Sequence, residues 1–405
     1  MNLSDFLNNA PELCGDIARY VNSVLETDQP GISLATAISF VGALRSKRIR
    51  SPQGIAPSIY TCAIASTGIG KTRAQHVITD ICTKADITSL LMGRPASDAG
   101  ILKRLQTSPR QYLIWDEFGL ALSEMSKSSS SYRVAILSCI MDLYSSAGRH
   151  HIGKEYAEKS RIDIASPFLS ISAVSTPNRF YDALTQDFIE DGFLSRWLVF
   201  EGQASILFKE PSKEPIPNSI LEKVIQINKG RERTEGGELQ KILSPDDPML
   251  RFESKYAVDG AKAHAQQRMI NASSETERAF WSRSFENFIK LCMIFSDQDN
   301  YISDRYAIFC WDLVDFLVTR IIERCKVDIQ AGSLQEKRHK KFVNLISVGS
   351  TLTQAELTKR ALNHGFDKDE RKRRIEDLIE NEIWIQSVRK NSDTNRQITE
   401  YTRKS

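Results

Sequence analysis

The sequence predicts an α/β fold in which a parallel β-sheet is covered by helices on both faces. Between about residues 55 and 205, short apolar runs of strand length alternate with amphipathic helical segments. Gly, Pro, Ser or charged residues bound each run, as expected for strands that end at a sheet edge. The apolar runs are SIYTCAIAS, ITSLLM, QYLIWDEF, FLSISAVS and RWLVFEG.

The length and composition indicate several domains and a substantial hydrophobic core. The chain has 405 residues, of which 41% are hydrophobic and 26% charged, and its formal net charge is +3. A chain of this length ordinarily folds as two or three domains. We expect an N-terminal helical region over 1–50, an α/β core over 51–205, a polar linker followed by helices over 206–330, and a separate small domain over 331–405.

The cysteines and the hydropathy pattern favour a protein of the reducing cytoplasm. None of the seven cysteines belongs to a C-x-x-C pair or to a Cys/His spacing typical of zinc sites. Most lie in apolar runs, where buried thiols are expected. The N-terminus lacks the basic and apolar leader of a signal peptide, and no apolar run reaches membrane-spanning length. We therefore expect a cytoplasmic protein that makes no membrane contact.

Residues 65 to 73 form a candidate phosphate-binding loop between a predicted strand and a predicted helix. The usual pattern is G-x-x-x-x-G-K-[ST], and Ala65 replaces the first glycine, which is the smallest change possible. Gly68 and Gly70 allow backbone N–H groups to approach a phosphate closely. Lys71 would reach the β- and γ-phosphates of ATP, and the Thr72 hydroxyl would bind Mg²⁺. The candidate nucleotide-binding residues of this loop are Ala65, Ser66, Thr67, Gly68, Ile69, Gly70, Lys71, Thr72 and Arg73.

Two carboxylates and a polar strand end supply further expected parts of a nucleotide site. QYLIWDEFG is an apolar run that ends in Asp116 and Glu117, and carboxylates at the end of a strand suit a site at the sheet edge. Asp116 would hold Mg²⁺ through water, and Glu117 would orient and deprotonate the attacking water. A later run ends in STPN, where Thr176, with Asn178 as the second choice, would contact the γ-phosphate. The pairing of these motifs with the loop argues against a chance GKT in an ordinary turn.

Arg196, in DGFLSRW, lies directly before the last predicted strand of the core. Its planar and permanently charged guanidinium suits the charge that develops on a transferred phosphoryl group. In a ring of identical subunits it would reach the γ-phosphate bound by the neighbouring copy. A salt-bridged surface arginine is the alternative.

Taken together, ASTGIGKT, LIWDEFG, SAVSTPN and DGFLSRW resemble the motifs of AAA+ ATPases of the helicase type. The likeness is to the uncharacterised P-loop ATPases of phage and plasmid replication, which are related to superfamily-three and MCM helicases. It covers roughly residues 10 to 325 and lies in the order of the motifs more than in residue identity. The resemblance implies a P-loop NTPase core and a C-terminal helical lid that carries a second arginine sensor. Arg283 is the expected sensor and Arg278 the second choice, with an ordinary helix-surface arginine as the alternative.

AGRHHIGKEYAEKSRIDI is a basic segment that would form a hairpin turning near Gly153 and Lys154. In superfamily-three and MCM helicases, a hairpin at this place in the motif order lines a central pore and tracks single-stranded DNA. The resemblance implies the same role here, with cations neutralising phosphates and His or Tyr156 stacking on bases. A solvated basic loop is the alternative. The candidate DNA contacts are Arg149, His150, His151, Lys154, Lys159 and Arg161.

Residues 331–405 predict a small basic domain of three helices followed by a β-hairpin. They contain 16 Lys and Arg against 11 Asp and Glu. Three helices and a hairpin describe a winged helix, in which the third helix enters the DNA major groove and the wing contacts the backbone. Many winged helices bind proteins instead, and this third helix is half acidic. The candidate duplex contacts are Lys368, Arg371, Lys372 and Arg374 in the third helix and Arg389, Lys390 and Arg396 in the wing.

These features predict a ring-forming, hexameric DNA helicase or translocase for the replication of a phage, plasmid or other mobile element. ATP and Mg²⁺ would bind between subunits, and the partners would be single-stranded DNA, origin duplex DNA and a primase or initiator protein. An ATP-gated initiator or helicase loader, which binds DNA or partner proteins without unwinding, uses the same nucleotide residues and is the second hypothesis. A signalling ATPase of a defence system, with the winged helix as a protein-docking module, is the third.

Overall fold

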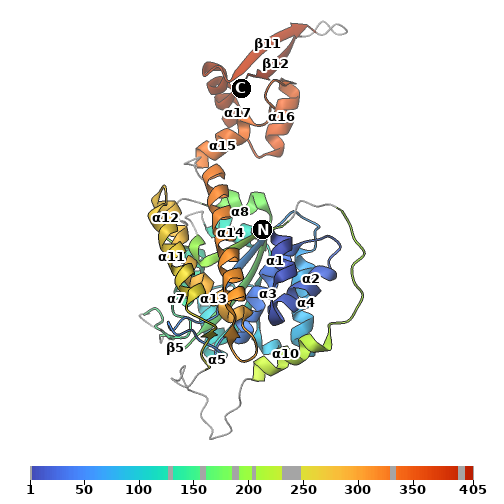
Figure 1. Cartoon of the computed structure of the whole chain (residues 1–405). Coiled ribbons are helices and arrows are strands. Elements are labelled where there is room, and N and C mark those ends of the chain that lie inside the picture. The colour runs from blue at the N-terminus through green and yellow to red at the C-terminus, as the bar shows by residue number, and fades with distance from the viewer. Residues whose placement is uncertain are drawn as a thin grey trace. The chain divides into compact units, whose positions relative to one another are not determined.

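The structure is a computed structural model that consists of two compact units, Met1–Lys326 and Val327–Ser405 (Figure 1). None of the helices in its described residues has the length and hydrophobicity that a membrane span requires. The structure describes residues 2–125, 131–155, 161–184, 191–202, 207–229, 248–328, 334–390 and 397–404.

A sheet of five parallel strands forms the centre of the first unit, so the predicted α/β fold is confirmed. The strand order is β2-β3-β6-β1-β7 among the described residues. β1 lies between β6 and β7, because Tyr60 is opposite Ile171 on one side and Trp197 on the other. The strands are β1 (Tyr60–Ile64), β2 (Leu91–Met92), β3 (Arg110–Trp115), β6 (Phe168–Ser175) and β7 (Trp197–Glu201).

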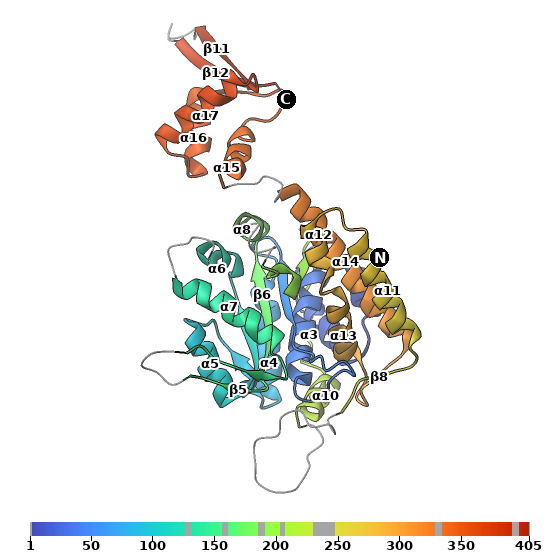
Figure 2. The same cartoon turned by 90° about the vertical axis from the view of Figure 1, so that its left-hand side faces the viewer.

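Helices cover both faces of this sheet, and its central strands are buried on both sides. All residues of β1 and β6 are buried. α3 (Pro30–Arg45) packs on β1, β3, β6 and β7, while α7 (Ser131–Ser145) contacts β6, and Figure 2 shows these two helices on opposite sides of β6. Every residue of α3 is buried, so this helix belongs to the core and has no polar surface face.

The other helices of the first unit connect and flank the strands. The N-terminal helices predicted over residues 1–50 are present, and α1 begins with a capping box in which Asn2 and Asp5 exchange hydrogen bonds. The helices are α1 (Leu3–Asn9), α2 (Glu12–Ser23), α4 (Lys71–Lys84), α5 (Asp98–Thr107), α6 (Phe118–Met125), α8 (Pro177–Ala183), α10 (Asn218–Lys229), α11 (Tyr256–Ile270), α12 (Glu275–Trp281), α13 (Ser284–Phe295) and α14 (Asp304–Asp328).

Two further pairs of short strands occur, one inside the segment predicted to form a hairpin and one in the region where helices were expected. β4 (His150–His151) pairs antiparallel with β5 (Ile164–Ala165), and β8 (Arg251–Phe252) pairs parallel with β9 (Tyr301–Ile302). The region 206–330, expected to hold a polar linker followed by helices, therefore also contains β8 and β9. Two-residue strands are too short to show an alternating hydrophobic pattern.

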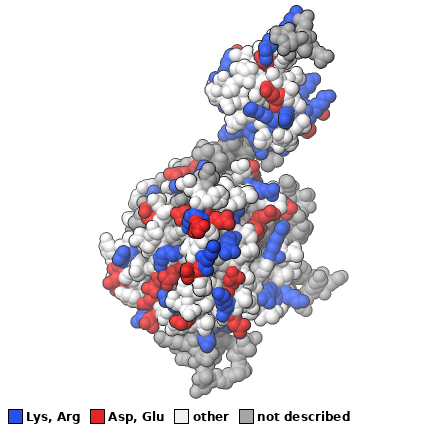
Figure 3. Space-filling model, turned by 90° about the vertical axis from the view of Figure 1, so that its right-hand side faces the viewer, with Lys and Arg blue, Asp and Glu red and all other residues white. Residues whose placement is uncertain are grey.

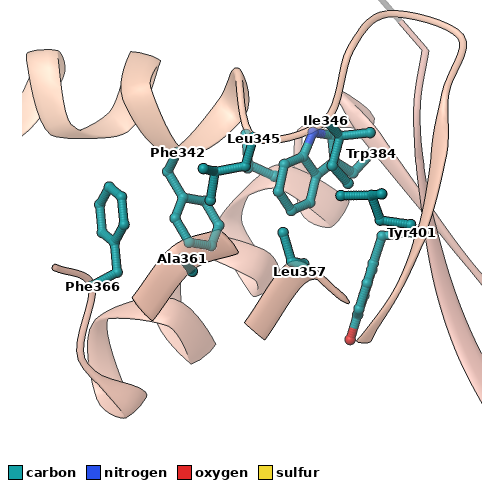
Figure 4. Packing of buried hydrophobic residues seen from close by; sticks show 10 residues of the cluster. Phe342, Leu345, Ile346, Leu357, Ala361, Phe366, Trp384 and Tyr401 are labelled. Carbon is teal, nitrogen blue, oxygen red and sulfur yellow. The ribbon is translucent and has the colours of Figure 1, made fainter. Parts of the chain in front are cut away.

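The second unit contains three helices and a three-stranded antiparallel sheet within its described residues. Its core joins the two parts, because Trp384 and Tyr401 of the sheet lie with Phe342 and Leu357 of the helices (Figure 4). The third strand, β10, pairs with β12 and was not predicted from the sequence, which indicated a two-stranded hairpin. The elements are α15 (Leu334–Val343), β10 (Thr351–Thr353), α16 (Gln354–Asn363), α17 (Lys368–Glu380), β11 (Trp384–Lys390) and β12 (Gln397–Arg403).

In the first unit, α6 packs closely against α8 through Gly119, the glycine of the DEFG segment. A Cβ at this position would lie 2.3 Å from the Oγ of Ser175 and 2.9 Å from the Cβ and carbonyl carbon of Arg179. The glycine therefore lets the helix that follows β3 approach the end of β6.

We expect Gly119→Ala to lower the free energy of unfolding by about 1–3 kcal/mol, because the added methyl group overpacks this contact. Gly260→Ala is the matched control, since Gly260 also lies in a helix but has open space where a Cβ would be. There the substitution should raise stability by about 0.5–1 kcal/mol. Urea unfolding followed by circular dichroism measures both changes, and an unaltered stability of Gly119→Ala would contradict the packing argument.

Candidate functional site

The phosphate loop connects β1 to α4 with a backbone that presents N–H groups to an anion. Gly68 and Gly70 have φ angles of +85° and +94°, a region in which a side chain would be strained. Gly70 is also the N-cap of α4, and the first N–H groups of a helix have no acceptor within it. A glycine-rich loop that leads into a helix N-terminus is suited to bind phosphate.

Ala65 fits the loop although phosphate loops usually have glycine at this position. Its N–H donates to the Ser175 carbonyl at 3.0 Å, and the residue is buried. Its Cβ faces Gly202, the residue after β7, and a Cβ built on Gly202 would lie only 2.6 Å away. The alanine in the loop and the glycine after β7 are thus complementary in size.

Lys71 lies inside the loop and faces the acidic end of β3. Its ammonium group donates hydrogen bonds to the carbonyl oxygens of Ala65 and Ser66, the latter at 2.8 Å. Burial lowers the pKa of Lys71, and the charge of Asp116 partly offsets this effect. The Lys71 ammonium group and the Asp116 carboxylate are therefore close enough to interact electrostatically.

The loop and the ends of β3 and β6 enclose a cavity of about 640 Å³. The carboxyl ends of parallel strands meet at one edge of a sheet, and ligands of open α/β sheets bind there. The cavity brings together Lys71, Thr72, Asp116, Glu117 and Thr176, all predicted from the sequence as parts of one site. The lining residues are Val24, Glu26, Thr67, Gly68, Gly70, Lys71, Thr72, Arg73, Asp116, Glu117, Val174, Ser175, Thr176, Arg179 and Pro211.

Glu117 has a left-handed backbone, with φ of +51°. This conformation costs on the order of 1 kcal/mol for a residue with a side chain, and such residues cluster at functional sites. The N–H of Glu117 donates to the Asp116 carboxylate at 2.8 Å, and both side chains are exposed at the cavity. The turn therefore places two consecutive carboxylates in one space.

Several lining residues belong to parts of the chain that the sequence did not single out. Arg179 lies one turn after Thr176 at the start of α8. Its position in STPNRF, close to the predicted Thr176, is the sequence signal that could have identified it. Val24, Glu26 and Pro211 come from two connecting segments without any motif. They form a wall of the cavity beside the phosphate loop.

Hydrogen bonds to backbone carbonyl groups hold these two connecting segments in place. The Thr27 hydroxyl donates to the Ile69 carbonyl of the phosphate loop at 3.3 Å. The Lys209 N–H donates to the Glu26 carbonyl at 2.7 Å. The connection between α2 and α3 is thereby joined to the loop on one side and to the segment after β7 on the other.

Some predicted nucleotide-binding residues do not line the cavity: Ala65, Ser66, Ile69 and Asn178. Asn178 is exposed on the first turn of α8. Arg278, the second choice for the lid sensor, forms an ion pair with Glu275 on its own helix.

Arg196 and Arg283, the two predicted phosphate-sensing arginines, lie near each other and away from this cavity. Arg283 pairs with Glu286 at 2.8 Å, and its guanidinium carbon lies 5.5 Å from the centre of the Tyr144 ring. Burial lowers the pKa of Arg196, and the charge of Arg283 lowers it further. Neither arginine lines the cavity that contains Lys71.

The predicted DNA-tracking hairpin contains β4 and β5, and two of its cations are paired with acids of the same chain. The Lys154 ammonium lies 3.0 Å from the Asp98 carboxylate at the start of α5. The Arg161 guanidinium lies 2.7 Å from the Asp163 carboxylate. These two cations therefore have protein partners already.

The remaining basic residues of this hairpin differ in exposure. Arg149 and His150 are exposed, whereas His151 is buried and its pKa is lowered by that burial. Tyr156 and Lys159 lie outside the described residues.

In the second unit, α17 directs only part of its basic residues to solvent. Lys368 and Lys372 are exposed. Arg374 pairs with Glu370 at 2.9 Å, and Arg371 donates to a backbone carbonyl of α16. Lysines, rather than arginines, are thus the predicted duplex contacts that remain accessible on this helix.

The strands of the second unit are also basic. Arg389 pairs with Glu400 across the hairpin at 2.7 Å, Lys390 is exposed, and Arg396 lies outside the described residues. Figure 3 shows Lys and Arg gathered on the visible face of this unit, while both signs of charge are mixed on the visible face of the first unit.

Comparison with known proteins assigns no family to the chain. No protein-family model matches it, and no curated protein matches it.

An ion-pair network in the second unit has a consequence for stability against acid. The Glu370 carboxylate accepts hydrogen bonds from Arg338 and Arg374. The bond from Arg338 is the main cause that lowers the pKa of Glu370 from 4.5 to about 2. Because the pKa is lower in the folded unit, the carboxylate stabilises the fold above pH 4.5, and this contribution is lost as the pH falls towards 2.

We expect Glu370→Gln to make the second unit less stable at pH 7 and to weaken its loss of stability between pH 4.5 and 2. Hydrogen exchange of residues 334–404 in the intact chain, measured by mass spectrometry across this pH range, tests the change. Glu376→Gln is the control, because Glu376 is exposed on the same helix. A pH dependence identical to that of the native chain would show that the network contributes nothing.

Proposed function

We propose that this protein is an AAA+ ATPase of the helicase type, which hydrolyses ATP at the interfaces of a hexameric ring and moves DNA during replication of a phage, plasmid or other mobile element. One observation carries the proposal: Lys71, Thr72, Asp116 and Glu117 line one cavity, although they follow two strands that a third strand separates. A lysine, a hydroxyl group and two carboxylates are the parts that phosphoryl transfer requires.

The strand order supports this proposal. β6 lies between β1, which leads into the phosphate loop, and β3, which leads into the two carboxylates. β6 ends just before Thr176, so this hydroxyl lies between the loop and the carboxylates at the sheet edge.

The cavity fits a magnesium nucleotide in size and chemistry. Its volume of about 640 Å³ falls within the range of roughly 300–1,000 Å³ typical of small-molecule sites. Thr72 and Asp116 would hold Mg²⁺, which supplies charge neutralisation for the phosphates when bound. Lys71 would bind the phosphates, and Thr176 would contact the terminal phosphate. Glu117 would accept a proton from the attacking water.

The positions of Arg196 and Arg283 support a site that a second copy completes. Both arginines carry charge suited to a phosphoryl group, yet neither lines the cavity of its own chain. In a ring, they would approach the nucleotide of the neighbouring subunit. Their proximity within one chain means that both would act from the same side of that interface.

Two observations bear on the proposed contacts with DNA. Arg149 and His150 are exposed at the base of the hairpin, and Lys368 and Lys372 are exposed on α17. Such side chains can neutralise phosphates of single-stranded or duplex DNA. The exposed lysines of α17 support a winged-helix role for the second unit, with α17 and the β11–β12 hairpin as its DNA-binding elements.

A helicase loader is the second candidate function, and a specific observation favours it. A hairpin that tracks DNA needs cations that can turn to phosphates, whereas Lys154 and Arg161 already form ion pairs with protein carboxylates. A loader needs the same ATP site and no pore grip. Strand displacement therefore separates the two functions.

We expect Lys71→Ala to lose ATP binding and hydrolysis, and Glu117→Gln to retain binding while hydrolysis falls by about 100-fold or more. The reason is that Lys71 contacts the phosphates, whereas Glu117 acts on water. Fluorescent-nucleotide binding and phosphate release, each with and without single-stranded DNA, measure the two steps. Arg278→Ala is the control that should hydrolyse normally.

A strand-displacement assay on a forked duplex completes this test. Unwinding that is lost in Lys71→Ala supports the motor. DNA-stimulated hydrolysis without displacement supports the loader instead. Full hydrolysis by Lys71→Ala would contradict the ATP site itself.

Mixing two inactive variants tests the shared site. We expect Arg196→Ala to lose hydrolysis, and a mixture of Arg196→Ala with Glu117→Gln to recover part of it. Recovery follows because some interfaces then combine an intact Glu117 with an intact Arg196 from the adjacent subunit. If Arg196 acted within its own chain, or had only a structural role, the mixture would remain as inactive as its components.

A further inference from the structure

A second cavity, of about 370 Å³, lies in the first unit between the end of α7, the segment before β1 and the start of α13. It shares no lining residue with the cavity of the phosphate loop. Its lining residues are Gly54, Ile55, Ala56, Tyr144, Ser145, Ala147, Arg149, Ser282, Arg283, Phe285, Glu286 and Lys290.

Lys290 is a buried cation at this cavity, with a side chain that is 2% exposed. Its ammonium nitrogen lies 3.1 Å from the Glu286 carboxylate and 3.3 Å from the centre of the Tyr144 ring. Apart from this contact with Glu286, the ammonium group has no hydrogen-bond acceptor among the described residues, although it carries three donors. The Tyr144 hydroxyl donates to Asn287, so this hydroxyl is already engaged. A buried ammonium group normally satisfies its donors, and here a ligand would do so.

The charges around Lys290 are unbalanced. Arg149 and Arg283 line the same cavity, and Arg196 acts on Lys290 from nearby, whereas Glu286 is the carboxylate among the residues that line the cavity. Burial lowers the pKa of Lys290 to about 8, and Glu286 offsets part of this effect. Burial alone would raise the pKa of Glu286, but the charges of Lys290 and Arg283 lower it, so the carboxylate is ionised. A single carboxylate leaves this group of cations with surplus positive charge.

The N-terminus of α13 adds to the positive potential. The cavity is lined by Arg283, which is the N-cap, and by the first turn of the helix. The Arg283 side chain donates to Glu286 and accepts no hydrogen bond, so the first N–H groups of α13 have no side-chain cap. A helix N-terminus carries a partial positive charge that favours anions.

We propose that this second cavity binds a phosphate group through Lys290, Arg283, Arg149 and the N-terminus of α13. Phosphate suits the arrangement because its oxygens accept several charge-assisted hydrogen bonds and because its double negative charge balances the surplus cations. The site does not depend on hydrolysis at the phosphate loop. Free inorganic phosphate and the terminal phosphate of a nucleotide share this chemistry, and the experiment below distinguishes them.

The test uses the full chain with Lys71→Ala, which weakens the phosphate loop. Titrations with inorganic phosphate and, separately, with ADP are followed by ³¹P NMR and give a Kd for each. Lys290→Met and Arg149→Gln are then added singly to this background. Lys255→Met is the matched control, because Lys255 is an exposed lysine of the same unit outside both cavities.

We expect the Kd to rise by about tenfold in Lys290→Met and in Arg149→Gln, and to stay unchanged in Lys255→Met. An effect on ADP that exceeds the effect on inorganic phosphate identifies the terminal phosphate of a nucleotide as the ligand, and the reverse identifies free phosphate. If Lys290→Met fails to fold, Arg149→Gln decides, because Arg149 is exposed and outside the core. A Kd that is unchanged in the folded variants would overturn the proposal.

Discussion

The hydrogen bond from the Ala65 N–H to the Ser175 carbonyl joins the two strand ends on which the candidate site depends. It fixes the start of the phosphate loop to the end of β6. The same serine is the closest neighbour of Gly119, so the helix that follows the two carboxylates is held at this point too. The backbone and the side chain of Ser175 thus contact both the start of the phosphate loop and the helix after the two carboxylates, next to Thr176.

The parts of the site that follow strands could be predicted from the sequence, because each strand is an apolar run with a polar residue at its end. Lys71, Asp116, Glu117 and Thr176 are all of this kind, and the parallel sheet brings their strand ends to one edge. The substitution at Ala65 obscured the loop pattern. It is compensated by Gly202, which is far away in sequence, so the compensation is visible only in the structure.

The rest of the site could not be predicted, because backbone contacts and distant ion pairs place it. The segments that contain Val24 and Pro211 are joined by main-chain hydrogen bonds of neighbouring residues, from Ser212 to Ser23 and from Lys209 to Glu26, and such bonds impose no pattern on side chains. The pairing of Lys154 with Asp98 joins residues that no helical or strand spacing relates. The hairpin therefore looked more basic in the sequence than its paired cations are in the folded protein.

Charge is balanced differently in the two cavities of the first unit. At the phosphate loop, Lys71 faces the carboxylates of Asp116 and Glu117. In the second cavity and beside it, several buried or half-buried cations share Glu286, and each disfavours the charge of the others. Buried positive charge is costly unless an anion offsets it.

A phosphate held by Lys290 would therefore also stabilise the charged form of Arg196, whose pKa is lowered by burial and by Arg283. Arg196 is the residue proposed to act on the neighbouring subunit, and its buried Nε has no acceptor among the described residues. The two proposals share Arg283, and different variants decide them: Arg196→Ala tests the shared ATP site, and Lys290→Met tests the second cavity. They are connected through one physical quantity, which is the electrostatic cost of keeping Arg196, Arg283 and Lys290 close together.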